Sequence, residues 1–182
     1  KTFHLYNEYF SYIFKVMKNQ QLGQLYYGKR INDHENFDHL CEMKARPMAA
    51  CAIEGDLTFS LEHLKQEYPS YGSGDMRHPA IDILQENGSH IVHFTYQSHE
   101  IIAGKPLLKN LPATYVEDNQ EATTLLVTLY DEVIETKIIL SYTIYENLSV
   151  LTRNAYIENC GTQKLVLNQA MSMSMDLPDM EY

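Results

Sequence analysis

The feature that most constrains this chain is a strict alternation of apolar and polar side chains. Apolar residues fall at every second position in two neighbouring segments, 121–132 and 135–147: Leu125, Val127, Leu129, Ile138, Leu140, Tyr142 and Ile144. A side-chain period of two is typical of a β-strand with one face in a core. The sequence therefore predicts two long strands, and the short gap between them favours an antiparallel hairpin.

Related patterns predict strands in six further segments: 9–17, 21–29, 80–88, 90–102, 150–159 and 163–175. Asn87-Gly88 is a strong type I′ turn signal and predicts a hairpin between two of them. Only the segment 60–68 suggests a helical turn, capped by Ser60 with Leu61 and Leu64 on one side. Many short strands with few or short helices predict an all-β fold, an antiparallel β-sandwich.

Composition limits the partners of such a domain. The 182 residues carry 14 basic and 24 acidic side chains, a formal net charge of −10. A negative field repels phosphate groups, which disfavours nucleic acid and anionic membranes as partners. No apolar run approaches the roughly 18 residues that span a bilayer. The three widely spaced cysteines form neither a disulfide framework nor a zinc signature, which predicts a reducing compartment and a cytoplasmic protein.

Neither a metal nor a cofactor is expected. His90 and His93 are three residues apart on a predicted strand, so their side chains point to opposite faces and do not share a metal. Two histidines of the irregular stretch 31–58 lie beside aspartates, and both a metal site and solvated loop residues are open readings: Asp33, His34, Asp38 and His39. Their spacing matches no strong ligand rule.

The segment "QEYPSYGSGDMRHPA", residues 66–80, admits several chemical interpretations. Its "YGSGD" run resembles a phosphate-binding loop, but no helix follows whose N-terminus could face the anion. Glycoside hydrolysis needs two carboxyl groups, and the sequence offers Glu67, Asp75 and Asp82 close together. No Gly-x-Ser-x-Gly nucleophile motif is present.

A structural turn is the favoured interpretation of the same segment. Pro69 and Pro79 fix φ, while Gly72 and Gly74 permit positive φ. The sequence further predicts that Asp75 tethers the turn and that it pairs with an arginine two residues later. Substitution of Asp75 is therefore expected to impair folding rather than a chemical reaction.

Several motifs then occur in a fixed order along the chain. They are "LYYGKRI" from Leu25, "QEYP" from Gln66, Tyr71-Gly72, Asp75-Met76-Arg77, Pro79-Ala80, Gly104-Lys105-Pro106, "LPATY" from Leu111 and "YTIYENLSVLTRNAYIEN" from Tyr142. Together they resemble the N-terminal region of family-36 glycoside hydrolases, the microbial α-galactosidases. Met76 stands where that family has Phe, at an expected packing position.

The resemblance implies an architecture and an activity. Residues 1–182 are expected to be an incomplete N-terminal β-sandwich of supersandwich type, from an enzyme whose catalytic (β/α)₈ barrel is absent here. That parent enzyme would hydrolyse terminal α-galactosyl residues of melibiose, raffinose and related oligosaccharides. Its retaining mechanism would use two barrel aspartates, so this chain alone is expected to be inactive.

The resemblance also implies roles for single residues and partners. The domain would support packing of its own catalytic barrel and assembly of a homo-oligomer, a tetramer. A loop near residues 42–48 would approach a neighbouring active site, where Arg46 and Lys44 are substrate-binding candidates. Glu67, Tyr68, Asp75 and Arg77 form the expected structural motif. Two alternatives are a stand-alone carbohydrate-binding module, with tyrosine replacing the absent tryptophan, and a scaffold for assembly only.

Overall fold

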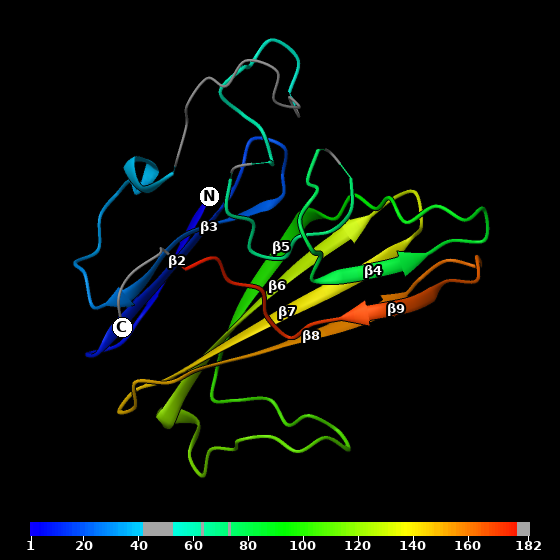
Figure 1. The fold of residues 1–182 in the computed structure, drawn as a ribbon. Helices are drawn as coiled ribbons and strands as arrows, with labels where there is room; N and C mark the ends of the chain where they lie inside the picture. The colour runs from blue at the N-terminus through cyan, green and yellow to red at the C-terminus, as the bar shows by residue number, and fades with distance from the viewer. Residues whose placement is uncertain (42–52, 63, 73, 178–182) are drawn as a thin grey trace.

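The structure, a computed structural model, describes residues 1–41, 53–62, 64–72 and 74–177. These residues are almost entirely strands and turns, and two single-turn 3₁₀ helices are present: η1 (Asp38–Leu40) and η2 (Asn119–Glu121). The predicted all-β, antiparallel fold is confirmed (Figure 1).

Three antiparallel sheets make up the described fold. The first contains β1 (Thr2–Tyr6), β2 (Phe10–Val16) and β3 (Leu22–Lys29). The second contains β5 (Thr95–Ala103), β6 (Ala122–Asp131), β7 (Thr136–Tyr145) and β8 (Leu151–Asn159). A third pair joins β4 (Ile81–Leu84) to β9 (Val166–Ala170).

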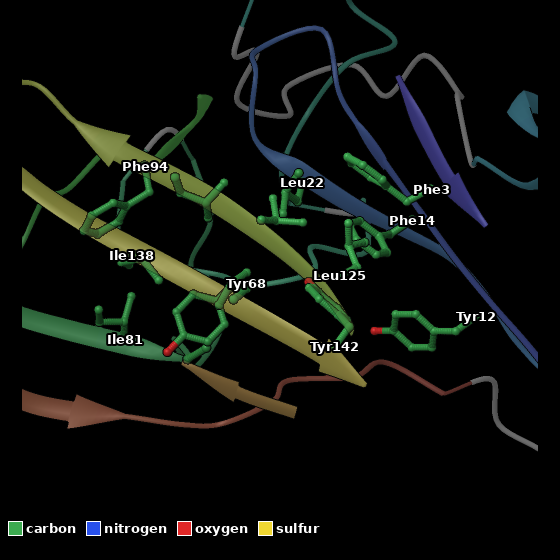
Figure 2. Close-up of a cluster of buried hydrophobic side chains, with 14 of the residues drawn as sticks. Phe3, Tyr12, Phe14, Leu22, Tyr68, Ile81, Phe94, Leu125, Ile138 and Tyr142 are labelled. Atoms are coloured by element: carbon green, nitrogen blue, oxygen red, sulfur yellow. The ribbon is translucent and has the colours of Figure 1, made fainter. Parts of the chain in front are cut away.

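The core lies where the first sheet faces the second. Phe14 of β2 stacks on Tyr142 of β7, with ring centroids 4.8 Å apart (Figure 2). The alternating apolar residues of β6 and β7 supply much of this core, with Val127 and Leu140 at 0% exposure. Burying each large apolar side chain contributes about 1.5–3 kcal/mol, so the alternation alone strongly fixes the register of these strands.

One predicted hairpin is wrong. The chain does turn at Gly88, whose φ is +83°, and the Gln85 amide donates to the Ser89 carbonyl at 3.0 Å. However, β4 pairs with β9 and β5 pairs with β6, so the two segments flanking the turn are not partners. Val92 and Phe94 enter the core instead, which carries the connecting segment from one sheet to the next.

Two smaller expectations are also corrected. His90 and His93 precede β5, which begins at Thr95, so they do not share a strand. The described residues of 60–68 form turns rather than a helix, although the Ser60 Oγ accepts the Glu62 amide at 3.3 Å. Leu61 and Leu64 nevertheless pack together in one small buried cluster.

Candidate functional site

The turn 66–80 is shaped by two glycines. Gly72 and Gly74 have φ values of +124° and +88°, a region that side chains with a Cβ rarely enter. Gly72 also lies close to the core segment, because a Cβ there would meet Ile91 Cγ2 at 3.0 Å and Val92 O at 3.3 Å. The Asp75 amide closes the turn by donating to the Gly72 carbonyl at 3.1 Å.

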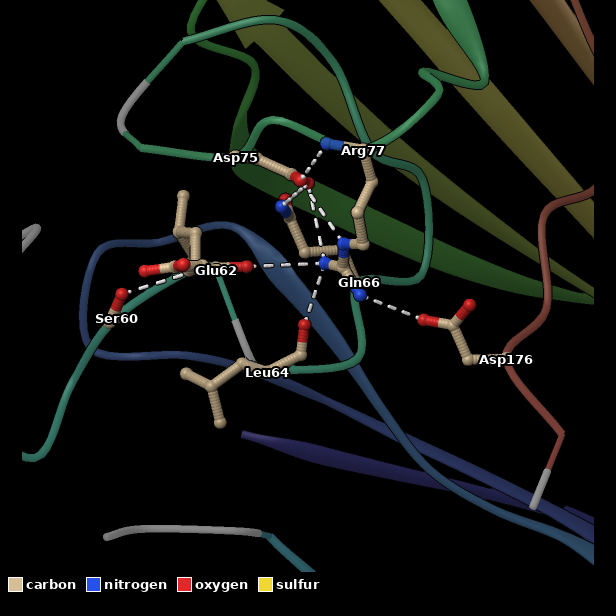
Figure 3. A network of polar contacts seen from close by, with 8 residues as sticks. Ser60, Glu62, Leu64, Gln66, Asp75, Arg77 and Asp176 are labelled. Carbon is tan, nitrogen blue, oxygen red and sulfur yellow. Dashed lines mark hydrogen bonds and ion pairs between the residues drawn. The ribbon is translucent and has the colours of Figure 1, made fainter. Parts of the chain in front are cut away.

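Asp75 is the centre of a polar network under this turn (Figure 3). Its side chain is 1% exposed, and its Oδ1 accepts from the Arg77 amide at 3.0 Å and from Arg77 Nε at 3.1 Å. Gln66 donates to the other carboxylate oxygen. The Arg77 guanidinium also donates to the Leu64 carbonyl at 2.7 Å and to Asp176 at 2.9 Å. The network therefore ties both ends of the turn to the C-terminal part of the described chain.

Glu67 points the other way, into the core. It is 0% exposed and accepts from Tyr12 Oη at 2.8 Å, from Tyr142 Oη at 2.9 Å and from Arg153 Nη1 at 2.5 Å. The Arg153 guanidinium lies over the Tyr142 ring, 4.2 Å from its centroid. Since these partners come from β2, β7 and β8, one carboxylate joins the turn to both main sheets. We name Glu67, Tyr12, Tyr142 and Arg153 the core latch.

Burial dominates the electrostatics of this latch. It raises the pKa of Glu67, while the Arg153 charge and the hydroxyl donors act in the opposite direction. It also raises the pKa of Tyr142 well above its ordinary value. Tyr68, the fourth residue of the expected motif, donates to the Met171 carbonyl at 2.8 Å, and burial raises its pKa to about 12.

Neither carboxylate of the turn has the access that catalysis requires. Glu67 is 0% and Asp75 is 2% exposed, and both are already paired with protein donors. Retaining glycoside hydrolysis needs two carboxyls about 5 Å apart around a sugar. Glu67, Asp75 and their partners can therefore hold the fold but cannot reach a substrate.

A Ser–His–Asp arrangement occurs at the edge of the first sheet and was not predicted from the sequence. His4 Nε2 lies 2.9 Å from Ser11 Oγ, and His4 Nδ1 lies 2.9 Å from Asp33 Oδ1. A nucleophilic serine must be reachable by substrate. Ser11 is 0% exposed, and its Oγ also accepts the Ile31 amide at 3.1 Å. The arrangement anchors the segment after β3 to the sheet and leaves no room for acyl transfer.

The candidate metal residues Asp33, His34 and Asp38 contact other protein groups. Within the described ranges, no group of three or more His, Cys, Asp or Glu side chains is placed to hold a metal ion. His34 Nδ1 instead contacts its own loop, 2.9 Å from the Asn36 carbonyl. The substrate-binding candidates Lys44 and Arg46 lie outside the residues that the structure describes.

Met76 does not occupy the expected packing position. Its side chain is 87% exposed, although the residues on both sides of it belong to the turn network. Beside it lies an open pocket of about 620 Å³ whose lining includes Tyr71, Asp82, His90 and Ile91. The expected site at 66–80 thus consists of a buried base and an exposed apolar tip.

Comparison with known proteins shows which family the chain matches. Residues 20–182 match the model of the glycosyl hydrolase family 36 N-terminal domain. The whole chain is 41% identical over 182 residues to "Alpha-galactosidase AgaA" of Geobacillus stearothermophilus, and it covers 25% of that protein. The chain therefore spans about a quarter of the length of this curated relative.

Solved structures agree with that match. The α-galactosidase from Lactobacillus brevis superposes with a TM-score of 0.93 at 38% identity, over 98% of this chain and 24% of that one. A variant of AgaA in complex with raffinose gives a TM-score of 0.89 at 41% identity, over 95% of this chain and 24% of that one. Among the described residues no helix is long and apolar enough to cross a membrane.

Proposed function

Because the chain belongs to the glycosyl hydrolase family 36 N-terminal domain family, we propose that it is the accessory β-sandwich of an α-galactosidase. The observation that carries this proposal is sequence similarity along the full chain to α-galactosidases. It is supported by the position of the family-like turn, whose carboxylates are buried in the fold rather than offered to a substrate.

The reaction of the parent protein is the hydrolysis of terminal α-galactosyl residues. Melibiose, raffinose and related oligosaccharides are the proposed substrates, and one relative has been crystallised with raffinose. The two carboxyl groups of a retaining mechanism would come from a catalytic barrel elsewhere in the polypeptide, since such sites form at the C-terminal face of parallel strands. No cofactor is required for this chemistry.

Expression of the complete gene product and of this chain alone tests the proposal. The complete protein should release galactose from raffinose and melibiose, and the 182-residue chain should release none. Lactose is the matched control, because it presents a β-linked galactose. A complete protein that cleaves lactose but neither α-galactoside would refute the proposed specificity, and cleavage by the chain alone would refute its accessory role.

The domain would have two further tasks in the complete enzyme, barrel packing and assembly of a homo-tetramer. The segment near Lys44 and Arg46 would form an active-site rim, where a guanidinium offers five hydrogen-bond donors to sugar hydroxyls. Arg46→Ala should then raise KM for raffinose in the complete enzyme. Unchanged KM and kcat would remove this role. The three widely spaced cysteines of the sequence support the proposed cytoplasmic location.

A stand-alone carbohydrate-binding module is the alternative. Tyr71 lines a pocket with Asp82 and His90, a combination of ring and polar groups that suits a sugar. Calorimetric titration of the isolated chain with galactose and melibiose separates the two. Heat of binding would favour the module, and no heat would favour the accessory domain.

A further inference from the structure

The turn that follows β4 contains the one Asn-Gly pair of the sequence, Asn87-Gly88. Gly88 has a φ of +83°, and a Cβ built on it would meet no atom of the described residues within 4 Å. Asn87 is exposed as well. The peptide between the two residues is therefore open to water, and no side chain of its own covers the Gly88 nitrogen.

The side-chain amide of Asn87 is oriented and polarised by a neighbouring donor. Its Oδ1 accepts a hydrogen bond from the Ser89 amide at 2.9 Å. A donor at this oxygen stabilises the negative charge that develops there when a nucleophile adds to the carbon Cγ. The same bond restricts rotation of the Asn87 side chain, which reduces the entropy lost in an intramolecular reaction. Asn87 Cγ is therefore prepared as an electrophile.

The nearest nucleophile is the Gly88 nitrogen after loss of its proton. This N–H donates to the Gln85 carbonyl at 2.9 Å, so that bond must open first. Backbone bonds in exposed turns open at a low cost in free energy. The flanks of the turn are held by other bonds, since Gln85 Nε2 donates to the Ile91 carbonyl at 2.7 Å and His90 Nδ1 lies 2.6 Å from Asp82 Oδ1. The reactive pair can thus form without unfolding of the domain.

We propose that Asn87 is a site of spontaneous deamidation in the folded protein. The deprotonated Gly88 nitrogen forms a bond to Asn87 Cγ, and the side-chain nitrogen takes up a proton from water and leaves as ammonia, which produces a cyclic succinimide. Water then adds to either carbonyl of the ring and opens it, giving aspartate or isoaspartate. Hydroxide is the base and water the other reactant. This inference does not depend on the sugar chemistry of the complete enzyme.

The two products affect the turn differently. Aspartate keeps an oxygen that accepts the Ser89 amide and adds one negative charge at an exposed position. Isoaspartate leads the main chain through the side-chain carbon, which lengthens the backbone by one methylene. The turn is closed by Gln85, which donates to the Ser89 carbonyl at 3.0 Å and accepts from Gly88. A longer backbone disrupts this closure next to the core residues Val92 and Phe94, so isoaspartate is the destabilising product.

Incubation of the complete gene product at mildly alkaline pH tests the proposal. Peptide mass spectrometry follows the mass gain from NH₂ to OH at each asparagine, and a protease that cuts before aspartate but not before isoaspartate separates the products. Asn147 is the internal reference, because it is also exposed in a turn but precedes Leu148. We expect Asn87 to convert about tenfold faster than Asn147, or about 1.4 kcal/mol in activation free energy. Isoaspartate at position 87 should appear, since it forms through the ring.

Two results would overturn the proposal. One is conversion of Asn87 in the native protein that is no faster than conversion of Asn147. The other is rapid conversion in urea with none in the native protein, which would mean that the bond from Gly88 to Gln85 protects the turn.

Variants of the complete protein test the route and its consequence. Asn87→Gln keeps an amide on a longer side chain, for which closure of the ring is slower, and should remain unmodified. Its unfolding midpoint should stay constant during incubation, whereas that of the unaltered protein should fall as isoaspartate accumulates. Asn87→Asp imitates the other product and should unfold at the midpoint of the fresh protein. An equal fall for Asn87→Gln and the unaltered protein would contradict a destabilising modification at this turn.

Discussion

Replacing Arg153 by methionine is the sharpest test of the core latch. The substitution keeps an unbranched apolar stem of similar length and removes the charge that faces Glu67. Glu67 would then be a carboxylate at 0% exposure with only the two tyrosine hydroxyls as donors. An ionised group without a countercharge is strongly disfavoured in such a position.

The expected cost follows from the burial of both partners. The side chains of Arg153 and Glu67 are 2% and 0% exposed, and removing one member of a buried pair costs about 3–5 kcal/mol. For a chain of this length, 1 kcal/mol corresponds to about 2–4 °C in the unfolding midpoint. Arg153→Met should therefore lower Tm by about 6–20 °C.

A matched control lies on the same two strands. Lys137 of β7 and Glu158 of β8 are paired in register and form an ion pair of 2.5 Å, with side chains 30% and 42% exposed. A pair at such exposure contributes about 0–1 kcal/mol. Lys137→Met should thus change the midpoint of thermal unfolding, followed by circular dichroism at pH 7, much less than Arg153→Met does.

The double variant separates charge from packing. With Glu67→Gln added to Arg153→Met, the amide oxygen still accepts from Tyr12 and no charge remains buried. Two further nitrogens of Arg153, Nε and Nη2, are buried without a hydrogen-bond partner among the described residues, and their removal ends that cost as well. The double variant should be more stable than Arg153→Met alone. Equal effects of Arg153→Met and Lys137→Met, or no recovery in the double variant, would refute the latch.

Three other predictions concern the turn and the response to pH. Asp75→Ala leaves the buried amide of Gln66 without its acceptor and should cost about 1–3 kcal/mol in urea unfolding; a neutral result would contradict the network. Lys18 donates to Asp56 and holds the pKa of that carboxyl at about 2, below its usual 3.8. The stabilisation by this pair is therefore present above pH 3.8 and is lost as pH falls toward 2, and Lys18→Gln should raise the Asp56 pKa measured by NMR titration. Burial raises the pKa of Tyr68 from 10.0 to about 12, so stability should fall as pH rises between these values, where only the unfolded tyrosine ionises. The difference between the ultraviolet titrations of the protein and of Tyr68→Phe should have its midpoint near 12, and a midpoint near 10 would exclude this.

The sequence predicted the strands well because their signal is local. The alternation in β6 and β7 correctly marks core residues such as Val127 and Leu140, but Thr124 and Thr143 of the opposite face are also buried. Pairing between distant segments is not local. Asn87-Gly88 correctly marks a reversal of the chain, but the partner of β4 is β9, which begins 82 residues after Leu84 at Val166. A turn signal contains no information about such a partner.

The core latch escaped prediction for a related reason. Tyr12 and Tyr142 are 0% exposed, and their hydroxyls are satisfied only because a carboxylate from the turn accepts a hydrogen bond from each. Arg153 lies in a segment with polar alternation and has no local mark of burial. The one sequence indication was that Glu67 belongs to a motif shared with the family, which predicted a structural role for it. Its partners could not be identified, because they are 55, 75 and 86 positions away in the sequence.

The two acidic residues of the turn stabilise different parts of the domain, Glu67 the core and Asp75 the surface tip. Glu67 binds both main sheets through the core latch, and Asp75, 2% exposed, fixes the geometry of the tip that carries Met76. Buried ion pairs add little net stability compared with apolar packing, and in several proteins their role is to specify a single arrangement. Glu67 and the Asp75–Arg77 pair together hold the turn in one position relative to both main sheets and to Asp176 near the end of the described chain.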